Sequence, residues 1–256
     1  AAGTAHTCAL LADGTVRCWG SNEYGALGSG TAGEAGRSPV TVSGLSTVTA
    51  IAAGAAHTCA LLANRTVRCW GSNTTTDAKD KRSISGQLGS NAAGKISSTP
   101  VAVTGLSTAI ALAAGLGHTC ALLANRSVRC WGSNVFGQLC SETLGNSPMP
   151  IAVKGISTAI AIAAVWVHTC ALLADGTVRC WGSNADGQLG RGTAGEPSHA
   201  PVTVRALSGV SAIAAGAVHT CALLADGTVR CWGSNADGQL GRGTVGGNSA
   251  RAVAVA

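Results

Sequence analysis

One hairpin-like segment recurs five times along this chain of 256 residues and restricts what the chain can fold into. It reads HTCALLADGTVRC at residues 6–18, and the first cysteines of successive copies are 51, 61, 50 and 51 residues apart. Residues 168–193 and 219–244 are identical. Periods of this length indicate repeated supersecondary units that stack on their neighbours. The longest spacing comes from an insertion in the second repeat, GSNTTTDAKDKRSISGQLG, which we expect at the surface.

Each period contains four strand-like runs: HTCALLA, TVRCWGS, a short PVTV and VTAIAAG. Turn residues separate them, and no amphipathic helix of ordinary length lies between them. Four strands in about 50 residues is typical of a propeller blade, and a solenoid of strands is the weaker alternative. We therefore predict an all-β fold, a β-propeller forming a single domain over residues 1–256. Its five four-stranded repeats are placed at roughly 1–54, 55–115, 116–164, 165–216 and 217–256.

The run GAVHTCALLADGTVRCWGSNADGQLGRGT at residues 216–244 resembles the regulator-of-chromosome-condensation repeat. The shared marks are a Gly shortly before the His, a D-G turn, W-G-x-N and G-Q-L-G, and all five periods carry most of them. The resemblance implies a β-propeller, usually with seven blades. Because this chain has five repeats, its seam is predicted to be open or incomplete.

The sequences at the two ends of the chain also bear on whether the five repeats close into a ring. The chain opens with AAG, which matches the tail of an AIAAG strand, and stops at ARAVAVA, which aligns with PVTV. The last period therefore lacks its fourth strand except for what the N-terminus supplies. Three outcomes remain: a five-bladed ring with a weak seam, part of a longer propeller, or an arc closed by another copy. The absence of an initiator Met suggests a processed product or an excised portion.

Ten of the eleven cysteines form five pairs with the same spacing. A hairpin loop of Ala12, Asp13 and Gly14, with Gly14 in the left-handed conformation, would place Cys8 directly opposite Cys18. A two-residue turn would instead put the two sulfurs on opposite faces of the sheet. We predict the three-residue loop and disulfides between Cys8 and Cys18, Cys59 and Cys69, Cys120 and Cys130, Cys170 and Cys180, and Cys221 and Cys231.

Zinc is the alternative for these cysteines, because the His of each repeat lies two residues before the first Cys. Structural zinc sites usually have four ligands and closely spaced cysteines, so we expect no metal and no cofactor. Five disulfides indicate an oxidising compartment and a secreted or cell-surface protein. Cys140, the eleventh cysteine, is predicted to be either a buried unpaired thiol or the site of an intermolecular bond.

Charge and hydropathy disfavour two classes of partner. The net charge is +6, but one Arg occupies the same place in every repeat, so positive charge is spread out rather than pooled. No apolar run is long enough to cross a membrane. We therefore predict neither nucleic-acid binding nor membrane insertion.

Residues that every repeat keeps are predicted to be scaffold. An active site needs one asymmetric arrangement, whereas each repeat has the same His and the same Trp of CWG. We expect these Trp side chains in the core, with a hydrogen-bond partner for each indole N–H. No unique nucleophile pair, paired carboxylates or phosphate-binding motif stands out, so the chain is predicted not to be an enzyme.

Positions that vary between repeats are the better candidates for function. Trp166, Tyr24 and Phe136 are the aromatic residues that do not recur, and they are candidate partner contacts, because aromatic side chains often anchor recognition. The alternative is that each fills a local gap in the packing. Sequons begin at Asn64, Asn73 and Asn125 and are candidate N-glycosylation sites.

These features predict an extracellular, non-catalytic propeller that serves as a binding module or as a structural subunit of a surface assembly. Its partner would be a protein, a glycan or copies of itself. One alternative is a secreted inhibitor or lectin-like binder, because the blade pattern is similar to that of secreted β-lactamase-inhibitor propellers. A remote alternative, implied by the founding family member, is a guanine-nucleotide exchange factor.

Overall fold

Each copy of the repeated segment folds into an antiparallel hairpin in the computed structural model, which describes residues 1–76, 82–91, 94–141 and 145–256. In the first hairpin, β1 (His6–Leu10) pairs with β2 (Val16–Asn22), and Cys8 lies directly opposite Cys18. Gly14 adopts a φ of 77°, which is the left-handed conformation that favours glycine. The predicted three-residue loop and register are therefore confirmed.

Two further strands flank each hairpin from the second one onward. Blade 2 has the strand order β4-β5-β6-β9, in which the small residues of the inner strand VTAIAA allow close packing. Blade 1 is β1–β3, and blades 3, 4 and 5 are β10–β13, β14–β17 and β18–β21. The remaining strands are β3 (Gly33–Thr41), β4 (Val48–Ala53), β5 (His57–Leu62), β6 (Val67–Ser72), β7 (Thr74–Thr76), β8 (Arg82–Ile84), β9 (Ile96–Ala102), β10 (Ala109–Ala114), β11 (His118–Leu123), β12 (Val128–Gly132), β13 (Ser147–Ala152), β14 (Ala159–Val165), β15 (His168–Leu173), β16 (Val178–Asn184), β17 (Gly195–Thr203), β18 (Val210–Ala215), β19 (His219–Leu224), β20 (Val229–Gly233) and β21 (Ser249–Ala254).

The blades are offset by one strand from the sequence periods. In each period the fourth run, VTAIAAG in the first, forms the inner strand of the following blade. Among the described residues, blades 2 to 5 consequently have four strands, whereas blade 1 has three and only an isolated bridge between Ala2 and Thr7 at its inner edge. The last sequence period accordingly contains three strands, as expected, and the blade that lacks its inner strand is the first.

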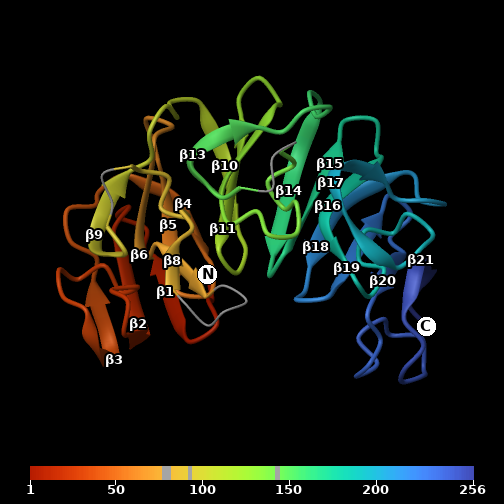
Figure 1. Ribbon diagram of the computed structural model, residues 1–256, viewed down its shortest axis with the longest axis horizontal. Helices are drawn as coiled ribbons and strands as arrows, with labels where there is room; N and C mark the ends of the chain where they lie inside the picture. The colour runs from red at the N-terminus through yellow and green to blue at the C-terminus, as the bar shows by residue number, and fades with distance from the viewer. Residues whose placement is uncertain (77–81, 92–93, 142–144) are drawn as a thin grey trace.

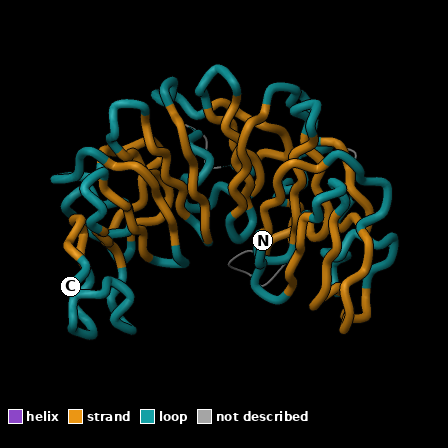
Figure 2. The backbone as a smooth tube through the Cα atoms, turned by 180° about the vertical axis from the view of Figure 1, so that it is seen from behind, coloured by secondary structure: helices purple, strands orange, loops and turns teal. Residues whose placement is uncertain are grey.

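The five blades follow one another around an arch (Figure 1). The inner strands β4, β10, β14 and β18 lie beside one another in that order, and β1 lies beside β4. Seen from behind, blade 1 and blade 5 stand at opposite ends of the same open arch (Figure 2). The predicted β-propeller fold is thus observed with an open seam.

The core is divided among the four joints between blades. At each joint, Cys, Leu and Val side chains of one blade pack against an Ala, a Leu and the Trp of the next. Four of the repeated Trp side chains have no exposed surface: Trp70, Trp131, Trp181 and Trp232. Truncating a buried Trp to Ala typically costs about 3–5 kcal/mol, so these contacts are major contributors to stability.

The insertion in the second repeat contributes a short antiparallel pair, β7 and β8, at its two ends. The middle of the insertion, residues 77–81, lies outside the described residues. Within the described part of the chain, no helix has the length and apolar character required to cross a bilayer.

Candidate functional site

Each repeated hairpin carries a disulfide between its paired cysteines. The S–S bond of Cys59 and Cys69 is 2.08 Å long, and the corresponding bonds in the other four hairpins range from 2.06 to 2.11 Å. Because the sulfurs of each pair are bonded to one another, the hairpins do not offer the thiolates that the zinc alternative required.

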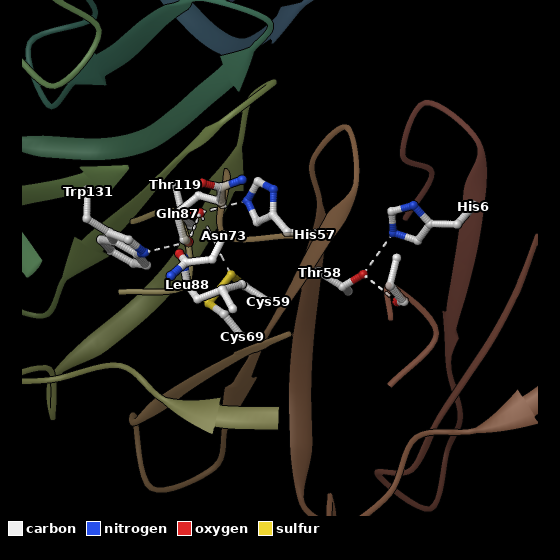
Figure 3. Close-up of a disulfide and its surroundings, with 11 residues drawn as sticks. His6, His57, Thr58, Cys59, Cys69, Asn73, Gln87, Leu88, Thr119 and Trp131 are labelled. Atoms are coloured by element: carbon white, nitrogen blue, oxygen red, sulfur yellow. Dashed lines mark hydrogen bonds between the residues drawn. A yellow bond between two sulfur atoms is a disulfide. The ribbon is translucent and has the colours of Figure 1, made fainter. Parts of the chain in front are cut away.

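The repeated His and Trp form a hydrogen-bond network across each joint (Figure 3). His57 Nε2 lies 2.9 Å from Thr119 Oγ1 on the next blade. Thr119 Oγ1 and the indole Nε1 of Trp131 both donate to the main-chain carbonyl of Gln87, at 3.2 and 2.9 Å. Since the threonine proton goes to the carbonyl, the imidazole donates from Nε2 and its Nδ1 carries the lone pair. The expected partner of each buried indole is therefore a main-chain carbonyl.

Burial keeps these histidines neutral. It lowers the pKa of His57 and His118 from 6.5 to about 3 and that of His168 to about 4, because a charged imidazole loses its hydration in the interior. The three rings have no exposed surface, so a substrate could not reach them. Their geometry supports the interpretation that the repeated histidines are scaffold.

In every blade a short turn leads into the repeated hairpin, and in blades 2 to 5 this turn follows the inner strand. These turns lie at the same end of all five blades, and the surface there is hollowed. We call this the hollow end; it contains the turns at residues 3–5, 54–56, 115–117, 165–167 and 216–218. A hollow of about 220 Å³ opens there, with walls from all five blades. The position two residues before each repeated His lines it and differs between blades: Thr4, Ala55, Leu116, Trp166 and Ala217.

Trp166 departs most from the repeat. It is 48% exposed and adopts a φ of 46°, a backbone conformation that is strained for any residue with a side chain. In the four other blades the turn begins with Gly, whose missing side chain makes room for the His ring; a Cβ on Gly115 would lie 2.2 Å from His118 Cε1. Blade 4 has Val165 instead, and β14 extends to it. The main-chain N–H of Leu116 donates to the Trp166 carbonyl at 2.8 Å and ties this turn to blade 3.

Tyr24 and Phe136 lie in loops at the same end of the blades. Tyr24 lines a second hollow of about 270 Å³ that shares Thr4 with the first, and its hydroxyl donates to the Glu23 carboxylate. Phe136 follows β12 and is 41% exposed, beside Val135 at 62%. The structure therefore brings the three non-recurring aromatic residues to one end of the arch, although no described contact joins them.

Leu116 and Val135 are exposed apolar residues at the hollow end that sequence reasoning did not single out. Both occupy positions where the repeats differ, which was the signal that identified the aromatic residues. An aliphatic side chain at such a position gave no reason to separate it from core residues.

The sequons differ in accessibility. Asn64 and Asn125 lie on exposed hairpin tips, where Oδ1 of each accepts hydrogen bonds from the residue two positions later. Asn73 has no exposed surface, and its Nδ2 donates to the Gly94 carbonyl at 2.9 Å. We correct the expectation for Asn73, because a glycan on that nitrogen would have no room in the folded protein.

Cys140 is unpaired and buried, with Sγ 3.9 Å from the Lys154 carbonyl. Burial raises the pKa of its thiol from 9.0 to about 11. The arrangement favours the buried thiol over an intermolecular bond, because the sulfur is neither ionised nor accessible.

Comparison with known proteins identifies the fold family. The model of the RCC1-like domain matches residues 1–255. The chain belongs to this family. Among solved RCC1-like structures, yeast RCC1 (Prp20) bound to Kap60 has a TM-score of 0.84 and 20% identity over 99% of this chain and 59% of Prp20. Human WBSCR16 has a TM-score of 0.84 and 24% identity over 99% of this chain and 65% of that one.

A plant receptor ectodomain is a third relative. The Physcomitrella patens receptor kinase CR4 ectodomain matches 91% of this chain and 50% of its own length, with a TM-score of 0.56 and 25% identity. This RCC1-like chain thus spans less than two thirds of the length of each of the three proteins.

Proposed function

We propose that this RCC1-like propeller is an extracellular, non-catalytic module that binds a partner protein at the hollow end. The observation that carries the proposal is the set of exposed apolar residues there that break the repeat. The repeated His and Trp side chains that form the four joints are buried, whereas Leu116, Phe136 and Trp166 are each at least 40% exposed. Exposed aromatic and aliphatic anchors around a hollow are typical of protein recognition.

The location outside the cell rests on the disulfides. Bonds of this number persist in oxidising compartments and are rare where thiols are kept reduced. The likeness to a receptor-kinase ectodomain supports the same location.

A secreted inhibitor or lectin-like binder is the second candidate. The half-exposed indole of Trp166 lines the same hollow as Thr4, and a sugar ring could stack on this indole. Binding to a glycan array without a protein partner would favour this candidate.

Nucleotide exchange is a third candidate, because the yeast relative Prp20 has been studied for its binding to Gsp1p and histones. The five disulfides argue against a role in the nucleus or cytosol, because disulfides are rare where thiols are kept reduced. Acceleration of GDP release from a Gsp1-type GTPase by the oxidised protein would favour exchange over the proposed function.

The experiment is a comparison of two variants with the native protein in binding to cell-surface and secreted proteins of the source organism. Replacement of Trp166 and Leu116 by Ala should weaken binding of a captured partner by about 10- to 100-fold, as expected for loss of anchor residues. The matched control is Ile160→Ala, which removes an apolar side chain that is 45% exposed near the start of β14, at the opposite end of that strand from Trp166. Equal binding by all three proteins would refute the hollow end as the binding site.

A further inference from the structure

The tips of the repeated hairpins lie at the end of the blades opposite the hollow end. Each tip holds the start of the next inner strand: the Ala109 main-chain N–H donates to the Arg65 carbonyl at 3.1 Å, and that of Ala159 to the Arg126 carbonyl at 3.0 Å. β10 begins beside Arg65 and ends with Ala114 in the wall of the hollow. The tips therefore form a second surface, separate from the hollow end.

Charge differs from tip to tip. The tips of blades 1, 4 and 5 each contain one Asp and one Arg and are neutral. The tips of blades 2 and 3, residues 63–68 and 124–129, have no acidic residue and contain four arginines, which we call the tip arginines: Arg65, Arg68, Arg126 and Arg129. Within the part of the chain that the structure describes, none of the four forms an ion pair. Positive charge, which the sequence led us to expect spread over the repeats, is thus concentrated at two neighbouring blades, each of which has a further blade on its other side (Figure 1).

The exchange of Asp for Asn at these two tips keeps the turn and removes a negative charge. In blade 1, Asp13 Oδ1 accepts hydrogen bonds from the main-chain N–H and the hydroxyl of Thr15, at 2.9 and 2.6 Å. In blade 2, Asn64 Oδ1 accepts the same two bonds from Thr66, at 3.1 and 2.7 Å. The hydrogen bonds from Thr15, and to a smaller degree Arg17, lower the pKa of Asp13, so its carboxylate is ionised and offsets the charge of that arginine. The blade 2 tip has no such offsetting charge.

Arg65 and Arg126 occupy a position that favours glycine. Their φ values are 64° and 65°, in the left-handed region, and the other three tips have Gly there. A side chain in this conformation costs about 1 kcal/mol or more. Both blades accept this strain at the same position, and in both the residue gained is an exposed Arg. Strain of this kind is common at functional sites, which favours a role for the charge.

An apolar side chain lies beside the tip of blade 2. Ile110 follows Ala109 at a β-bulge of the inner strand and is 45% exposed. The same position carries Thr49 in blade 2 and Ser211 in blade 5, where the hydroxyl donates to a main-chain carbonyl at 3.3 and 3.1 Å. Isoleucine cannot donate this hydrogen bond. Its presence therefore exposes apolar surface next to Arg65 and gives up a polar contact.

We propose that the tips of blades 2 and 3 bind an acidic protein segment, whose carboxylates meet the tip arginines and one of whose apolar side chains contacts Ile110. Charge complementarity selects the sign of the partner, and arginine can bind a carboxylate through two parallel hydrogen bonds. A short segment fits better than an anionic membrane or a long polyanion. Either of these would also extend over the exposed carboxylates of Asp13 and Asp175 on the flanking tips, which repel negative charge.

The test measures binding of a fluorescent peptide in which one Leu stands between two pairs of Asp, by anisotropy at low ionic strength, where charges are weakly screened. The double variant Arg65→Gly, Arg126→Gly restores the residue found at the other tips, so its denaturant midpoint should be no lower than that of the native protein. It should weaken peptide binding by about tenfold or more. The matched control, Arg37→Ala with Arg251→Ala, removes two exposed arginines from β3 and β21, reaches the same net charge and should leave binding unchanged.

The apolar contact has a test of its own. Ile110→Thr installs the residue that blade 2 has at this position, so the hydroxyl can donate to the main chain and the fold should be retained. This variant should weaken binding of the Leu peptide, and it should not affect a peptide in which Asn replaces the Leu. A peptide in which Asn replaces every Asp should not bind the native protein.

Four results would overturn the proposal. The first is no binding of the acidic peptide by the native protein. The second is equal weakening by the matched control, which would leave net charge as the cause. The third is tighter binding of single-stranded DNA, or of vesicles of phosphatidylserine and phosphatidylcholine, that depends on Arg65 and Arg126. The fourth is a glycan on Asn64 or Asn125 of the mature protein, found by intact mass, because it would cover the tips. None of these measurements involves the hollow end, so failure of the proposed function would leave this inference intact.

Discussion

Acid should loosen the joints between blades through their buried histidines. In the unfolded chain these side chains titrate near 6.5, whereas in the folded protein the pKa is about 3 for His57 and His118 and about 4 for His168. Between these limits the unfolded state binds more protons, so the free energy of unfolding falls as the pH falls. The stabilisation is fully present above about pH 6.5 and is lost progressively towards the folded pKa.

The size of the effect follows from the three pKa shifts. Each histidine contributes a slope of about 1.4 kcal/mol per pH unit in this window. From pH 7 to pH 5 each should remove about 2 kcal/mol, which amounts to about 6 kcal/mol for the three. That loss is comparable to the whole stability of many domains.

Denaturant midpoints measured at pH 7, 6 and 5 without reductant provide the assay. His118→Gln should reduce the loss of unfolding free energy between pH 7 and pH 5 by about 2 kcal/mol relative to the native protein, whatever it does to stability at pH 7. The matched control, His219→Gln, removes a partly exposed histidine without a Thr partner and should change the slope less. A stability that does not vary from pH 7 to 5, or equal slopes in the native protein and His118→Gln, would show that this reasoning is wrong.

Three other changes test the hairpins. Arg65 takes a φ of 64° at a tip where three of the other four repeats have Gly, so Arg65→Gly should stabilise the protein by about 1 kcal/mol in thermal or chemical unfolding. Gly227→Arg, at an uncrowded tip with a φ of 84°, should destabilise the protein by a similar amount. Unchanged stability in both variants would show that backbone strain at these tips is unimportant. Replacement of Cys120 and Cys130 by Ala should cost about 2–3 kcal/mol in the same measurement, and no loss would contradict a stabilising role for that bridge. Alkylation of the native protein at pH 8 should leave Cys140 unmodified, because burial raises its pKa to about 11; rapid labelling would contradict its burial.

Much of the fold could be predicted because its information is local and repeated. The hairpin register followed from the loop length, and the register in turn fixed which cysteines face one another. The buried Trp and its need for a hydrogen-bond acceptor followed from its presence in every repeat. The acceptor itself, a carbonyl on the neighbouring blade, could not be predicted, because no pattern within one repeat specifies a contact between two.

The other differences between the expectations and the structure also arise because the pattern within one repeat does not specify contacts between repeats. The break between periods was placed by sequence alone, so it assigned the inner strand to the wrong blade. The sequence marked Asn73 as an accessible sequon. Its burial could not be read from the sequence, because it depends on hydrogen bonds to Gly94 and Lys95, which lie about 20 residues later in the chain. At the hollow end, variation between repeats identified Trp166, but only the packing shows that Leu116 stands beside it in one cavity.

The one-strand offset between period and blade bears on how such a chain can change its length. A duplicated period adds a hairpin and an outer strand to one blade and supplies the inner strand of the next. Insertion or loss of a whole period therefore leaves every interior blade complete, wherever in the array the event occurs. The identical stretches 168–193 and 219–244 are consistent with recent growth by this route. The number of repeats can then vary by recombination between them. Before and after such an event, each blade is joined to the next through the inner strand that the preceding period supplies.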